Sequence, residues 1–114
     1  MELGARGEEI AARHYKRNGW QILDRNWRCS SPNRTRGELD LIVRKGRQIA
    51  IVEVKTRRTT DYGHPLEAVT EAKQHRIRRL AAAWRAETGA RGPTFRFDVA
   101  SVVGSRVQIH PGVF

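Results

Sequence analysis

Cysteine is nearly absent from this chain: Cys29 is the only one among 114 residues. A single cysteine excludes an internal disulfide and any metal site built from several cysteines. The four histidines are not spaced as zinc ligands, and no apolar run reaches the ~20 residues that cross a bilayer. Because the N-terminal residues are charged where a signal peptide is apolar, we expect a cytoplasmic protein without a membrane contact.

Acidic residues are also few, and this imbalance points to a partner. The chain has 12 of them against 22 Lys and Arg, a formal net charge of +10 at pH 7. Only four of the 22 cations are lysines, and arginine forks bind phosphate oxygens in a bidentate geometry. The composition therefore predicts a nucleic-acid partner, although a GC-rich genome or a heat-adapted surface gives the same excess of arginine.

No glycine-rich phosphate loop, nucleophile elbow or dinucleotide fingerprint occurs in the sequence, so we expect no small-molecule cofactor. The length suits a single domain, 1–114. Apolar periodicity predicts an α/β domain with a mixed central sheet flanked by helices, in the order helix, three strands, helix, two strands. The helices are expected at 2–18 and 65–88, and the strands at 20–25, 38–44, 48–55, 95–103 and 106–110.

Charged residues interrupt two apolar strands that a short turn joins into a hairpin. Strand side chains alternate, so Glu38 and Asp40 lie on the same face of the first strand, and Glu53 and Lys55 lie on the same face of the second. A loop of even length brings all four to one surface, whereas an odd loop separates them. A two-residue turn sets Glu38 opposite Glu53, and a four-residue turn over 45–48 sets Asp40 opposite Glu53.

Carboxylates that face one another on adjacent strands repel and destabilise a sheet, so this arrangement needs compensation. A hard divalent cation supplies it, and Mg²⁺ takes carboxylate oxygens together with phosphate and water oxygens. The pattern predicts Asp40 and Glu53 as metal ligands, with Lys55 beside them. The alternative is structural: Glu38 faces solvent, and Glu53 and Lys55 form an ordinary pair on an edge strand.

These residues carry a family resemblance. Gly-Glu-Leu-Asp at 37–40 followed by Glu-Val-Lys at 53–55 resembles the split PD-(D/E)xK nuclease signature, with Leu39 where that signature often has proline. Residues 4–8 resemble the helix that carries a glutamate in archaeal Holliday-junction resolvases. The bacterial YraN-like family, which is largely uncharacterised and assigned to the restriction-endonuclease-like fold, is similar at residues 7–8, 25–26, 37–42, 52–57, 67–69 and 97–99.

The resemblance implies a restriction-endonuclease-like core and a metal-dependent nuclease that hydrolyses phosphodiester bonds, on structured DNA in repair or recombination. Mg²⁺ or Mn²⁺ is the implied cofactor, and Glu8 is an expected further ligand and catalytic residue beside Asp40 and Glu53, with Glu9 as a competitor for that role. Lys55 is expected to stabilise the phosphate or to orient the attacking water. Whether Glu38 is a ligand, a partner of a ligand or a bystander stays open.

Several basic and polar residues are expected to contact the nucleic acid around this acidic centre. They are Arg34, Arg36, Arg57, Arg58, Lys73, Gln74 and Arg76. A homodimer is expected by analogy with junction resolvases of similar size. The alternative function is a catalytically weak nucleic-acid-binding module that keeps the nuclease fold and acts through a partner protein.

Overall fold

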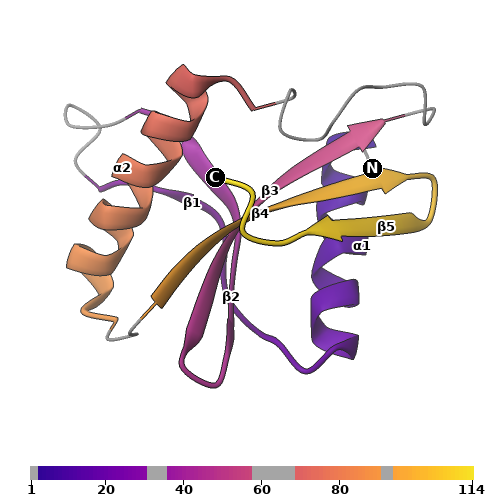
Figure 1. Ribbon diagram of the computed structural model, residues 1–114, viewed down its shortest axis with the longest axis horizontal. Coiled ribbons are helices and arrows are strands. Elements are labelled where there is room, and N and C mark those ends of the chain that lie inside the picture. The colour runs from indigo at the N-terminus through magenta and orange to yellow at the C-terminus, as the bar shows by residue number, and fades with distance from the viewer. Residues whose placement is uncertain (1–2, 31–35, 58–68, 91–93) are drawn as a thin grey trace.

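The computed structural model describes residues 3–30, 36–57, 69–90 and 94–114. Within them, five strands form one sheet in the order β1-β2-β3-β4-β5, with a helix on either side (Figure 1). The elements are α1 (Leu3–Arg17), β1 (Gln21–Arg28), β2 (Glu38–Lys45), β3 (Gln48–Arg57), α2 (Glu71–Thr88), β4 (Thr94–Val103) and β5 (Arg106–His110). The predicted α/β class and element order are confirmed.

The sheet is mixed, as predicted. The β1–β2, β2–β3 and β4–β5 pairs are antiparallel, whereas β3 and β4 run parallel. Parallel neighbours need a long crossover connection, and α2 lies in the one between β3 and β4. The helix is thereby laid across one face of the sheet, and α1 covers the opposite face (Figure 1).

Both faces of the sheet are buried because successive residues of its central strands point in opposite directions. Ile49 and Ile51 of β3 belong to the apolar core under α2, which includes Trp84. Ala50 and Val52 belong to a second core, under α1. In the described part of the chain, no helix is long and apolar enough to span a membrane.

The second helix begins later than predicted. Thr70 is its N-cap, with extended backbone angles (φ −62°, ψ 160°), and its side-chain oxygen accepts a hydrogen bond from the Lys73 amide at 3.2 Å. A threonine in this position satisfies an amide that the first turn leaves without a partner, so the helix starts at Glu71. The predicted start at Pro65 lies outside the described residues. The predicted end is confirmed, since Gly89 closes the helix in a left-handed conformation (φ 66°).

The first strand is longer than predicted and reaches Arg28 instead of residue 25. Its apolar alternation is lost around Asn26, which has a positive φ of 48°. Asparagine tolerates this left-handed conformation better than most residues. Beyond it the strand resumes, and Trp27 pairs with Leu39 of β2 and packs against the core under α2.

A buried aspartate in β4, Asp98, ties the α1 layer to the sheet. The Tyr15 hydroxyl donates to its carboxylate at 2.9 Å, Arg96 donates two hydrogen bonds at 2.8 and 2.9 Å, and the Gly112 amide donates at 3.0 Å. Burial, followed by the nearby Asp98 charge, raises the pKa of Tyr15 well above its usual range. The aspartate is fully buried, yet four hydrogen bonds stabilise it.

Asp98→Asn should lower the free energy of unfolding by about 2–4 kcal/mol, because it removes the charge of a fully buried carboxylate that pairs with the partly exposed Arg96. Tyr15→Phe should lower it by about 1 kcal/mol, the contribution of one hydrogen bond. Urea denaturation measures both, with Gln108→Ala on exposed β5 as the control. An Asp98→Asn protein as stable as this control would contradict the assigned role.

Candidate metal centre

The register of the β2–β3 hairpin brings the predicted acids together. Lys45 pairs with Gln48 across a two-residue turn, and the pairs follow in step down the hairpin. Continued by one residue beyond its last pair, this register sets Asp40 opposite Glu53. This pairing of Asp40 with Glu53 is the one predicted for a four-residue turn over 45–48. The difference is that Lys45 and Gln48 belong to the strands, which leaves a turn of two residues.

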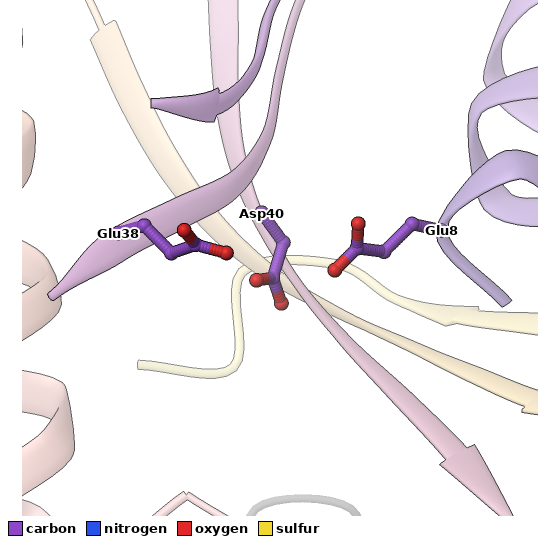
Figure 2. A group of neighbouring side chains, drawn as sticks. All are labelled: Glu8, Glu38 and Asp40. Atoms are coloured by element: carbon purple, nitrogen blue, oxygen red, sulfur yellow. The ribbon is translucent and has the colours of Figure 1, made fainter. Parts of the chain in front are cut away.

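Three carboxylates converge where the two strands separate, and we call them the acid cluster: Glu8, Glu38 and Asp40 (Figure 2). Glu38 and Asp40 come from β2, and Glu8 reaches in from α1. Each offers an oxygen atom that lies within 4.8 Å of the other two. The Val54 amide of β3 also donates to Asp40 Oδ2 at 2.9 Å, which fixes that carboxylate at the open end of the hairpin.

The position of α1 selects Glu8 over its neighbour Glu9. Gly7 is buried, and a side chain in its place would collide with Thr56 of β3, so only glycine allows this close approach. Glu9 points elsewhere, to Arg13 at 3.1 Å and Arg25 at 2.6 Å. Of the two candidates, Glu8 is therefore the residue of the acid cluster.

Asn26 of β1 is a cluster neighbour that the sequence did not single out for a role. With its amide nitrogen turned towards the carboxylates, it donates to Glu8 at 2.9 Å and to Glu38 at 3.3 Å. A polar residue late in an edge strand gives no signal of its own. The pairing of β1 with β2 brings Asn26 level with the acids, and its amide partly offsets their repulsion.

The environment of Asp40 and Glu8 favours their protonated forms when no cation is bound. Burial, followed by the charge of Glu53, raises the pKa of Asp40 to about 7, although the Val54 hydrogen bond opposes the shift. Burial and the charges of Glu38 and Glu53 also raise the pKa of Glu8, against the amide of Asn26. A divalent cation relieves this repulsion, and carboxylate oxygens are the ligands that Mg²⁺ and Mn²⁺ prefer.

Glu53 lies beside the acid cluster but pairs with two lysines. It is buried, with 7% of its surface exposed, and its Oε1 lies 2.8 Å from Lys73 Nζ and 3.9 Å from Lys55 Nζ. Its charge still acts on Asp40 and Glu8. The predicted role of Glu53 as a metal ligand stays a prediction. Among the described residues, the carboxylates grouped closely enough to share an ion are those of the acid cluster.

Lys73 reaches Glu53 from α2. The sequence predicted this lysine only as a contact to nucleic acid. Burial lowers the pKa of Lys55, and the neighbouring Lys73 side chain lowers it further through a hydrogen bond to Lys55 and through its positive charge. Burial alone would also lower the pKa of Lys73, but Glu53 outweighs it and the net shift is upwards. A sequence signal for this inward position exists, because Lys73 lies one helical turn before the buried Ile77.

The other α2 residues predicted to bind nucleic acid lie close to the start of the helix. The Gln74 side chain donates to the Val69 carbonyl at 3.0 Å and so fixes the entry into α2. Arg76 passes Gly37, where a Cβ would lie 3.2 Å from the arginine Cδ. Gly37 has a φ of 108°, so glycine is favoured there and β2 can begin beside α2.

The remaining predicted contacts are arginines on both sides of the hairpin. Arg36 is exposed immediately before β2, and Arg57 is partly exposed at the end of β3. Arg34 and Arg58 lie outside the described residues. Their predicted contacts with nucleic acid stay predictions.

Asp40→Asn should make the metal-free protein more stable at alkaline pH. The folded-state pKa of Asp40, about 7, lies above the ordinary value of 3.8, so the folded protein retains a proton that the unfolded chain loses between these values. The free energy of unfolding of the natural protein should therefore fall by a few kcal/mol as the pH rises from about 4 to about 8.

Asparagine cannot ionise, so Asp40→Asn should lack that part of the decline. Urea denaturation in EDTA at about pH 5 and about pH 8 measures the difference. Glu71→Gln, an exposed acid of α2, is the control. A variant that is less stable than the natural protein at the higher pH would contradict the repulsion described above.

Mn²⁺ should bind to the acid cluster and raise the melting temperature of the natural protein. Glu8→Gln should weaken Mn²⁺ binding about tenfold or more, because one carboxylate ligand is lost. Glu9→Gln removes the same charge from the adjacent position and should leave the affinity almost unchanged. Isothermal titration calorimetry with both variants separates these outcomes, and equal losses in the two would exclude a specific site.

Comparison with known proteins places the chain in a group of relatives. A family model described as "Uncharacterised protein family UPF0102" matches residues 7–102, which include the whole acid cluster. A UPF0102 protein of Nocardia farcinica is 52% identical over 101 residues, covering 89% of this chain and 76% of the relative. One from Arthrobacter sp. is 48% identical over 101 residues, covering 89% of this chain and 81% of the relative.

A UPF0102 protein of Leifsonia xyli is similar over nearly its whole length. It is 44% identical over 117 residues, covering 98% of this chain and 95% of the relative. The names of these relatives state no activity. The resemblance to the YraN-like family is confirmed, and the chain belongs to the uncharacterised protein family UPF0102.

Proposed function

We propose that this protein is a metal-dependent nuclease that hydrolyses phosphodiester bonds of structured DNA in repair or recombination. One observation carries the proposal: three carboxylates lie within 4.8 Å of one another, beside Lys55 and Lys73. The net charge of +10 adds a long-range attraction for a polyanion. Acids that hold a cation, with basic groups around them, suit a phosphodiester substrate.

The acid cluster fits Mg²⁺ or Mn²⁺ by the chemistry of its donors. All three side chains offer oxygen, and each is only partly buried, which leaves access for water and phosphate. A bound ion of this kind polarises a phosphate oxygen and lowers the pKa of bound water. In the proposed site Glu8, Glu38 and Asp40 would hold the ion, and Asp40 would do so in its deprotonated form.

Glu53 and the two lysines form the other half of the proposed site. Lys55 lies two residues beyond Glu53 in β3, on the same face of the strand, so its ammonium group lies beside the Glu53 carboxylate. We assign to Lys55 the stabilisation of negative charge on the reacting phosphate. Lys73 holds Glu53 by the 2.8 Å ion pair, and Glu53 would be able to serve as a further ligand only if it left that lysine.

The proposed substrate contacts surround this centre. Arg36 precedes β2, Arg57 ends β3, and Gln74 and Arg76 lie on the first turns of α2, with Arg34 and Arg58 included from the sequence. Arginine and lysine contacts to phosphate position a duplex without reading its sequence, so structure selects the substrate. A second copy of the chain is part of the proposal, because two strands of a junction need two centres.

Cleavage of labelled linear, flap and four-way-junction DNA, with Mn²⁺ or Mg²⁺ against EDTA, tests the proposal. The natural protein should cut at least one of these substrates only when a metal is present. Asp40→Asn and Lys55→Ala should each lower the rate by about 100-fold or more, because each removes a group that acts on the reacting phosphate. Lys16→Ala removes an exposed lysine of α1 and should leave the rate unchanged.

Binding to the same DNA in EDTA gives the second readout. Asp40→Asn should keep or raise the affinity, since it removes a negative charge from a surface that faces phosphates. If no substrate is cut while DNA binds tightly and in a salt-dependent manner, the enzyme proposal fails and a nucleic-acid-binding module remains. Cleavage that survives both substitutions would place the active site elsewhere.

A further inference from the structure

A groove separates α2 from β4 on the side of the helix away from β1, and we call it the α2–β4 groove. Its volume is about 320 Å³, within the range of ~300–1,000 Å³ that is common for ligand sites. It is lined by Arg78, Ala81, Ala82, Arg85, Phe95 and Phe97. Two arginines, two phenyl rings and no acid therefore share one small concave surface.

The cations of this groove face its aromatic rings. The guanidinium carbon of Arg85 lies 5.2 Å from the centre of the Phe95 ring. That of Arg78 lies 5.9 Å from the Phe97 ring and 5.8 Å from the Phe114 ring. Phe97 and Phe114 are themselves stacked, with ring centres 5.3 Å apart and planes 28° from parallel. Guanidinium groups from α2 therefore lie over the rings of β4, and a flat ring that enters the groove can stack on these guanidinium planes, with the phenyl rings beneath them.

We propose that the α2–β4 groove binds unpaired bases of single-stranded DNA. Bases stack on aromatic rings and on arginine planes without regard to sequence, and arginines at such a site also pair with the adjoining phosphates. Arg78 and Arg85 are seven residues apart on one helix, about 10.5 Å along its axis at ~1.5 Å per residue. That spacing suits phosphates on either side of a short run of bases.

The charge of the groove argues against the other occupants that an apolar surface can have. A second copy of this chain also carries a net charge of +10, so the contact between the two copies of the proposed homodimer is placed outside this groove and its two arginines. An apolar helix would remove the guanidinium group of Arg78 from water without giving it an anion. A polyanion with flat apolar rings answers both requirements, and single-stranded DNA has its bases free to stack.

The groove also lies along the helix that leads to the acid cluster. Lys73, which pairs with Glu53, precedes Arg78 by five residues, about 7.5 Å along α2. The Arg78 end of the groove is therefore the end nearer to the proposed metal centre along α2. This inference rests on the proposed nuclease function for its biological meaning, and it assigns to that function a substrate with an unpaired segment, such as a flap or a gap.

The decisive experiment measures binding in EDTA, where no cleavage occurs. Fluorescence anisotropy compares a labelled oligo-dT strand with a blunt duplex of equal length, for the natural protein and for the double variant R78K/R85K. Lysine keeps the charge but not the planar guanidinium, so phosphate binding is retained and stacking is lost. We expect the affinity for the single strand to fall about tenfold and that for the duplex to change by less than about twofold.

Two further variants complete the design. Arg79→Lys makes the same exchange at an exposed position of α2 outside the groove and should change neither affinity. Phe95→Leu keeps an apolar side chain without a π face and should reproduce the loss for the single strand, with circular dichroism to confirm folding. If R78K/R85K binds the single strand as tightly as the natural protein and Arg79→Lys do, the assignment is overturned.

The same samples separate this inference from the nuclease proposal. If the groove variants lose single-strand binding while no DNA is ever cut, the groove is supported and the nuclease function is not. If metal-dependent cleavage is present but the groove variants behave as the natural protein does, the reverse holds. An oligo-rU strand serves as the RNA arm, and binding to RNA alone would replace DNA as the ligand.

Discussion

Repulsion between carboxylates held at the open end of one hairpin is the constraint around which this molecule is arranged. The β2–β3 register brings Asp40 level with Glu53, and α1 adds Glu8 beside Glu38. A fold selected for stability alone would have no reason to gather these charges, because like charges on adjacent strands destabilise a sheet. The surrounding groups, an amide from β1 and lysines from β3 and α2, each reduce part of the repulsion.

The elements around the acid cluster have their own compensating interactions. On the α1 side of the sheet, Asp98 is fully buried and accepts hydrogen bonds from Tyr15 and Arg96. Such a saturated carboxylate contributes to stability, whereas the acid cluster, with a pKa of about 7 at Asp40, does not. Asp98 and the acid cluster thus have opposite electrostatic character, and that contrast makes the acid cluster the candidate functional site of this domain.

The sequence was informative wherever a periodic pattern was long. Alternation in 38–44 and 48–55 predicted the hairpin and its charged face, and it did so because burial on both sides leaves few positions for polar residues. It was less informative where local chemistry decides. The start of α2 depends on a cap at Thr70 instead of Pro65, and the extra length of β1 depends on pairing with β2 across Asn26. The inward position of Lys73 could be read from its spacing to Ile77, but its ion pair with Glu53 depends on how α2 packs against the sheet.

The close approach of Gly7 to Thr56 has a thermodynamic consequence. Glu8 belongs to the acid cluster only while α1 is docked on the sheet, so an ion that uses Glu8 binds the docked state more tightly than a state with the helix detached. Linkage is reciprocal: the free energy by which docking strengthens ion binding is the free energy by which the ion strengthens docking. An ion bound at the acid cluster would therefore hold α1 more firmly against the sheet, and release of that ion would make detachment of the helix easier.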